Sequence, residues 1–156
     1  FYGYVAMDVP LLITNLTGCE RNRWRDEDSN DACTLLTLLV KAITQVTPGA
    51  KLGSTAPYAR AEFVMLEVGQ AQPRSLANAF LDPVRLNANR ANPMEQSVSK
   101  IADYLTGLEG MYGDTGEKRF VSTIHEWKRD KEQVVPLEDA VAGALGMLFA
   151  AQGGQS

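Results

Sequence analysis

The sequence opens with a strand–helix–strand pattern, and this pattern constrains the fold more than any other feature. "FYGYVAMDV" (residues 1–9) alternates with a period of two, which is typical of a strand with one buried face. Residues 31–46 carry apolar side chains at helical spacing. "AEFVMLEV" (61–68) is apolar on both faces, as in a central strand covered on both sides. The buried face of the first strand would consist of Phe1, Val5, Met7 and Val9.

A unit of this kind with long connections fits half of a ferredoxin-like or RNA-recognition fold, so we predict the α+β class. A doubly wound sheet would need more such units than the chain contains. The remaining elements are expected as a loop across 13–30, a short helix or turn at 75–80, a linker at 87–93, a helix near 94–111, a strand at 119–124, a solvated run at 125–133 and a final helix from Pro136.

The length of 156 residues suits one domain, and we expect residues 1–152 to form it and 153–156 to be a disordered tail. Because the chain starts at Phe1, inside a strand and without an initiator Met, we expect it to be the C-terminal part of a longer protein. No apolar run approaches the roughly 20 residues that span a bilayer, and no signal segment opens the chain. These features favour a cytoplasmic protein with no membrane partner.

The segment "TPGAKLGSTAPY" (47–58) has the residue types of a phosphate-contacting loop. It is not a nucleotide-binding Walker A loop, because Lys51 precedes Gly53 and the loop follows a helix instead of opening one. Glycines let backbone amides approach an anion, Lys51 adds charge, and Ser54 adds a hydroxyl donor. The alternative is a surface loop of turn-forming residues with a solvated lysine. The net charge of −4 weighs against a freestanding nucleic-acid binder, although local basic patches can still bind phosphate.

The other candidate residues point to no enzyme. His125 is the only histidine and has no cysteine or second histidine beside it in the sequence, so we expect no metal and no cofactor. Cys33 lies on an apolar helical stretch and is expected to be a reduced core thiol. Tyr2 and Tyr4 share one strand face, where they could stack on bases or pack against an upstream part of the chain or another subunit.

Several stretches occur together in the order found in a known family. "FYGYVAMDVPLLITNL", a helix ending "VTPGAK", then "STAPYARAEFVMLEVG" and "PRSLANAF" resemble the C-terminal half of CasC, the backbone subunit of the type I-E CRISPR surveillance complex Cascade. The resemblance is clear over residues 1–86 and loose beyond them. It implies a modified RNA-recognition fold, the palm of a subunit whose copies line up along one CRISPR RNA. It implies no catalytic role.

The resemblance also implies which residues contact the guide RNA. Lys51 in "PGAK" stands where the family contacts phosphates, and Arg85 follows the "NAF" stretch at a second basic position. Where the family often has another basic residue this sequence has Asp82, so Arg74 or Arg90 could substitute.

We therefore expect a non-catalytic guide-RNA-binding subunit with RNA contacts at Lys51, Gly53, Ser54 and Arg85. Its partners would be the CRISPR RNA, copies of itself, other Cascade subunits and, through the guide, target DNA. Two alternatives stay open at this point. One is an RNA-recognition module unrelated to CRISPR that stacks bases on Tyr2 and Tyr4. The other is a ferredoxin-like enzyme or ligand-binding domain, which would need a closed pocket with convergent polar groups.

Overall fold

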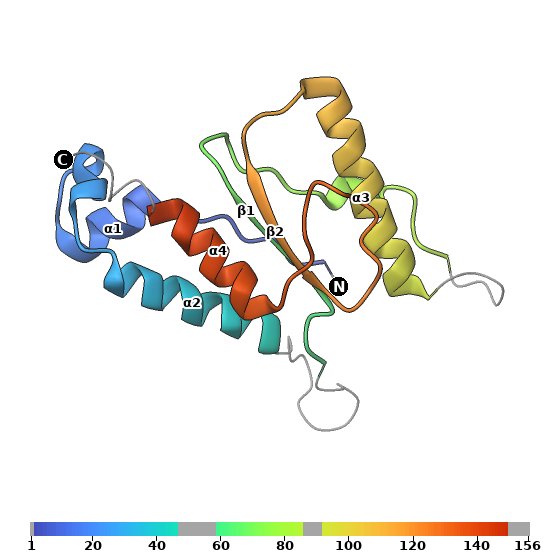
Figure 1. The fold of residues 1–156 in the computed structure, drawn as a ribbon, viewed down its shortest axis with the longest axis horizontal. Helices are drawn as coiled ribbons and strands as arrows, with labels where there is room; N and C mark the ends of the chain where they lie inside the picture. The colour runs from blue at the N-terminus through green and yellow to red at the C-terminus, as the bar shows by residue number, and fades with distance from the viewer. Residues whose placement is uncertain (1, 47–58, 86–91, 150–156) are drawn as a thin grey trace.

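The computed structural model describes residues 2–46, 59–85 and 92–149, and the structural statements below concern these residues. Helices surround a small antiparallel sheet (Figure 1), which agrees with the predicted α+β class. The elements in chain order are α1 (Val9–Thr17), η1 (Arg21–Asp26, a 3-10 helix), α2 (Asn30–Gln45), β1 (Phe63–Val68), η2 (Ala77–Phe80, a 3-10 helix), α3 (Pro93–Tyr112), β2 (Lys118–Thr123) and α4 (Leu137–Phe149).

The sheet lies between α3 and α4, which stand on opposite sides of it in Figure 1. β1 pairs with β2 in the register Phe63↔Thr123 to Val68↔Lys118. On one face, Phe63 and Met65 pack beside buried side chains of α3. On the other face α4 approaches so closely that its Gly143 contacts the ring of Phe120. β1 is thus covered on both faces, as its sequence predicts, but within the described residues its only strand neighbour is β2.

Two apolar clusters hold the helices in place. The first joins α1, η1 and α2, and the C-terminal part of α4 packs against it; its buried members are Val9, Ile13, Trp24, Ala32 and Leu36. The second joins η2 and α3 to the sheet; its buried members are Leu76, Ile101 and Leu105. The predicted helices near 31–46, 94–111 and from Pro136, the strand at 119–124 and the short helix at 75–80 are all confirmed within one to three residues.

The prediction of a strand at residues 1–9 is wrong for the described part. Residues 2–8 take no strand conformation, and α1 begins at Val9. Val5 is 58% exposed and Met7 39% exposed, and Val9 is buried as the first residue of α1 and not as part of a strand. The physical reason is that none of the described residues pairs with this segment as a neighbouring strand. Without a partner strand, an alternating pattern cannot bury its apolar side.

The prediction of a loop across 13–30 is also wrong, because α1 extends to Thr17 and η1 follows it. The start of α1 is fixed by Asp8, whose carboxylate accepts a hydrogen bond from the amide of Leu11 at 3.0 Å. Pro10 occupies the first turn, where its missing N–H costs nothing. Gly18 ends the helix with φ of 77°. The expected tail at 153–156 and most of the expected linker at 87–93 lie outside the described residues.

Candidate nucleic-acid interface

The segment predicted to contact phosphate lies outside the described residues, and with it Lys51, Gly53 and Ser54. The two ends that carry the segment are described. The amide of Ala61 donates a hydrogen bond to the carbonyl oxygen of Thr44 at 2.9 Å, so the chain leaves α2 and enters β1 at neighbouring points. Thr44 is only 6% exposed, and its hydroxyl donates to the carbonyl of Val40 at 2.8 Å. The residues on both sides of 47–58 are therefore anchored to α2.

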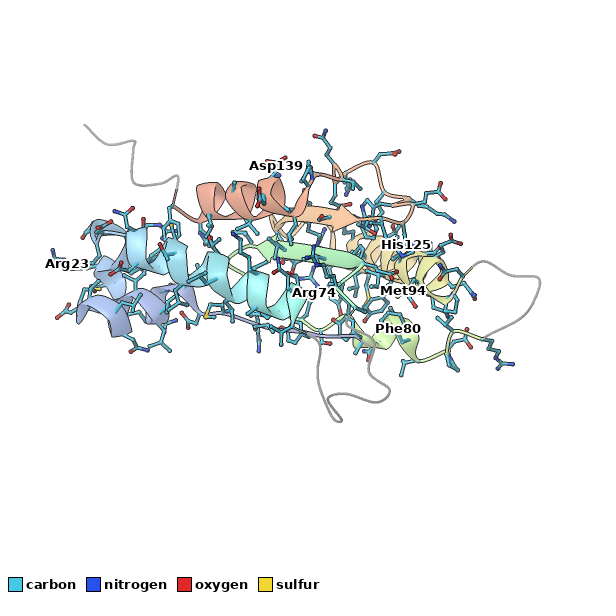
Figure 2. All side chains as sticks on the ribbon, turned by 90° about the horizontal axis from the view of Figure 1, so that it is seen from below. Arg23, Arg74, Phe80, Met94, His125 and Asp139 are labelled. Atoms are coloured by element: carbon cyan, nitrogen blue, oxygen red, sulfur yellow. The ribbon has the colours of Figure 1, made fainter. Side chains whose placement is uncertain are left out.

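The β1 end of this stem is also tied to β2. The carbonyl oxygen of Glu62 accepts the hydroxyl of Thr123 at 3.0 Å and the amide of Ile124 at 3.2 Å. The carboxylate of Glu62 lies 2.8 Å from Nε2 of His125, whose side chain is 8% exposed. His125 (Figure 2) thus takes part in a local hydrogen-bond network at the base of the segment.

Arg85, the second predicted contact, is exposed and follows η2 along the chain. The amide of Leu76, just before η2, donates to the hydroxyl of Tyr2 at 2.8 Å, and the Tyr2 ring lies 5.7 Å from that of Phe80. Asp82, which stands where the family often has a basic residue, pairs with Lys100 of α3 at 2.9 Å.

Tyr2 and Tyr4 differ in their surroundings, although the sequence predicts them on one face. Tyr2 is 40% exposed and engaged with η2 through its hydroxyl and its ring. Tyr4 is 45% exposed. Tyr2 therefore packs against η2 within this chain, which neither of the two readings of the sequence included.

Arg74 is unsuited to replace the missing basic residue, because its charge is already neutralised. Its guanidinium lies 3.1 Å from the carboxylate of Glu117 and 3.4 Å from that of Glu67. Its side chain is 30% exposed. A phosphate would have to compete with two carboxylates, one on β1 and one directly before β2. The other suggested substitute, Arg90, lies outside the described residues.

The run 125–133, expected to be solvated, instead contains a buried ionic network. Arg129 and Glu132 are 8% and 7% exposed, and Arg129 Nε lies 2.9 Å from Glu132 Oε2. Arg129 also bonds to Glu109 of α3 at 2.7 Å, and Arg119 of β2 bonds to the same carboxylate at 2.5 Å. The network joins α3, β2 and the segment after β2. The sequence signal that could have found it is Trp127, an aromatic residue inside a charged run; it packs on Phe63 and donates to Glu132 at 3.3 Å.

The charges of this network are strongly stabilised in their ionised forms. Burial raises the pKa of Glu109, but hydrogen bonds from Lys131 and Arg129 outweigh it and lower that pKa to about 2. Burial lowers the pKa of Arg129, but its hydrogen bonds to Glu132 and Glu109 raise it overall. The guanidinium of Arg129 therefore has a structural role, because it is already paired with the carboxylates of Glu109 and Glu132.

A small pocket lies apart from this network. A pocket of about 110 Å³ near α1 is lined by Ile13, Leu16, Thr17, Asp28 and Asp31, well below the roughly 300 Å³ at which ligand pockets begin. Within residues 2–46, 59–85 and 92–149, no three His, Cys, Asp or Glu side chains are grouped to hold a metal ion. In the same ranges, no helix is both long and apolar enough to cross a membrane.

Comparison with models of protein families shows which family the chain belongs to. Residues 1–147 match the model of the CT1975-like protein family, which is CRISPR-associated. The chain belongs to this family. A search of curated proteins found no match to the sequence.

Solved structures show the same fold for this member of the CT1975-like family. One similar chain, from a structure described as a CRISPR RNA-guided surveillance complex, superposes with a TM-score of 0.65 at 18% sequence identity. The match covers 83% of this chain and 50% of that chain, so the present chain spans about half the length of the solved relative. The fold is therefore one that occurs in a subunit of such a complex.

Proposed function

We propose that this chain is a non-catalytic, guide-RNA-binding backbone subunit of a type I-E Cascade surveillance complex, similar to CasC. Several copies would polymerise along one CRISPR RNA in antiviral defence, contacting other Cascade subunits and, through the guide, target DNA. The family match over residues 1–147 carries the proposal. The fold shared with a chain of a CRISPR RNA-guided surveillance complex supports it.

The sheet of β1 and β2, with α3 and α4 on its two faces, is proposed to belong to an RNA-recognition-type palm. The packing of helices on a small antiparallel sheet supports this proposal.

Phosphate contacts are proposed for Lys51 and Arg85, with Gly53 and Ser54 supplying close backbone approach and a hydroxyl donor. The anchored ends of the 47–58 segment, at Thr44 and Ala61, would hold such a loop in place. Arg85 is exposed, whereas Arg74 already bonds to carboxylates. Contacts of this type bind the RNA backbone and leave its sequence to base pairing.

The test is salt-titrated binding of guide RNA to the protein and its variants. Lys51→Ala and Arg85→Ala should each weaken binding equally for unrelated guide sequences and reduce the salt slope by about one charge. Lys118→Ala is the matched control, because Lys118 is exposed at the opposite end of β2 from Thr123, whose hydroxyl bonds to Glu62. An unchanged slope in both variants, or an equal effect of the control, would remove these residues from the interface.

The alternative, a single-stranded RNA-binding module unrelated to CRISPR, is favoured by one observation, the exposure of Tyr4. A stacking module should lose about 1–3 kcal/mol per base when its aromatic residue becomes alanine. Tyr4→Ala with a large loss and Lys51→Ala with none would select this alternative. The reverse result would select the backbone subunit.

A further inference from the structure

The short helix η2 precedes Arg85 along the chain, and its own sequence does little to hold it in place. It spans only Ala77–Phe80, and its N-cap residue, Leu76, makes no side-chain cap hydrogen bond. A 3-10 helix of this length has poor hydrogen-bond geometry and depends on its surroundings. Packing supplies one hold on it, because Leu76 is buried in the apolar cluster that joins η2 to α3, and Phe80 packs against the same cluster.

Tyr2 supplies the second hold, because it contacts both ends of η2. Its hydroxyl accepts a hydrogen bond from the amide of Leu76 at 2.8 Å, although the two residues are 74 positions apart in the sequence. Its ring lies 5.7 Å from that of Phe80 (Figure 2), the last residue of η2. In a capping box, a Glu or Gln side chain of the helix itself accepts the backbone N–H of the N-cap residue. Here the Tyr2 hydroxyl takes that role from outside the helix.

The chain between η2 and Arg85 is tied to its surroundings as well. The amide of Leu81 donates to the carbonyl oxygen of Asn78 at 3.3 Å, which joins the first residue after η2 to the helix. The carboxylate of Asp82 pairs with Lys100 of α3 at 2.9 Å. Arg85 itself is exposed. The point from which its side chain extends therefore depends on where η2 is held.

We propose that Tyr2 is a positioning residue for RNA binding, which holds η2 so that Arg85 is in place before a phosphate arrives. This inference rests on the proposed function, because it takes Arg85 as a phosphate contact. A cation that is already in place loses less conformational freedom on binding, so affinity rises without any new contact. Tyr2 needs no contact with the RNA for this role, and its effect on binding acts through Arg85.

A double-mutant cycle of Tyr2→Phe and Arg85→Ala tests this link, with labelled single-stranded RNA of two unrelated sequences as the probe. Tyr2→Phe keeps the ring and removes the acceptor of the Leu76 amide, so it should weaken the binding of both sequences by about threefold. In the Arg85→Ala background the same change should have no further effect. A general loss of stability would weaken binding in both backgrounds, so the cycle separates a positioning role from a merely structural one.

Tyr112→Phe is the matched control, because it makes the same chemical change at a tyrosine that does not touch η2 through its hydroxyl. Tyr112 is the last residue of α3 and is 66% exposed. Within the described part of the chain, its hydroxyl forms no hydrogen bond. Tyr112→Phe should therefore bind both RNA sequences as tightly as the unchanged protein, with and without Arg85→Ala.

Two results would overturn the inference and leave the proposed RNA contact in place. The first is that Arg85→Ala weakens binding while Tyr2→Phe binds as tightly as the unchanged protein. The second is that Tyr2→Phe weakens binding by the same factor in both backgrounds, or no more than Tyr112→Phe does. A third result, unchanged binding in Arg85→Ala, would refute the proposed contact itself, and the positioning role of Tyr2 would fall with it.

Discussion

Replacing Gly143 of α4 by alanine is expected to lower the stability of the fold, whereas the same change at Gly146 on the same helix is not. A Cβ atom added at Gly143 would lie 2.5 Å from Cε1 and 2.8 Å from Cδ1 of Phe120. Carbon atoms in contact prefer about 3.5–4.0 Å, so the ring or the helix must move by roughly 1 Å. A Cβ atom at Gly146 would meet no atom within 4 Å.

The two substitutions to alanine should therefore change stability in opposite directions. Alanine in place of glycine inside a helix stabilises by about 0.5–1 kcal/mol, and Gly146→Ala should show this gain. At Gly143 the same gain is opposed by overpacking, which costs about 1–3 kcal/mol. The variants should differ by about 2 kcal/mol in free energy of unfolding, or roughly 4–8 °C in Tm for a chain of this size.

Urea unfolding followed by circular dichroism measures this difference, with m-values compared to confirm that the unfolding transition is unchanged. A double-mutant cycle with Phe120→Leu identifies the partner, because a smaller side chain at 120 should recover most of the loss in Gly143→Ala. Equal stability of the two alanine variants would refute the close contact of α4 with the sheet.

Two further outcomes follow from the hydrogen-bond networks. The pKa of Glu109 is lowered from 4.5 to about 2, so its ionised form stabilises the fold by about 3 kcal/mol above pH 4.5, and this contribution is lost as the pH falls to about 2. In urea unfolding at a series of acid pH values, Glu109→Gln should therefore lose less stability between pH 5 and pH 2 than the unchanged protein. An equal loss in both proteins would contradict the assignment. Tyr2→Phe should speed hydrogen exchange at the Leu76 amide by about fivefold, because it removes the hydroxyl acceptor at 2.8 Å. Exchange at the amides of β2 should stay unchanged and serves as the control. Equal exchange at Leu76 in both proteins would show that the contact does not form.

The helices and strands with a partner inside the chain were predictable from the sequence. α2, α3 and α4 have apolar stripes that meet the sheet or each other, and β1 is apolar on both faces because a helix covers each of them. Residues 2–8 have an equally clear pattern and still form no strand, since pairing depends on a neighbour that periodicity cannot supply. α1 is hidden from sequence reasoning because it begins at the end of the strand-like run, with its cap Asp8 inside that run and Pro10 directly after it.

The candidate site was predictable only in part, because sequence shows charges but not their partners. Arg74 could be considered a phosphate contact until Glu67 and Glu117 proved to lie beside it. The run that contains Arg129 and Glu132 has the composition of a solvated segment, and its burial depends on Glu109, which is distant in sequence. Lys51 remains a prediction, supported by the anchored ends of its segment.

The pairing of cations within the fold limits how strongly the chain could hold RNA in its proposed role. Arg119 and Arg129 are each bonded to carboxylates, and the chain as a whole carries a net charge of −4. If Lys51 and Arg85 are the two phosphate contacts, counterion release predicts a salt slope of only about −1.4 per subunit on single-stranded RNA. Such an interface is weak alone and gains its strength when neighbouring copies bind adjacent stretches of one guide, because each further copy then joins at high effective concentration. A steep slope for an isolated subunit would point to cations other than these two.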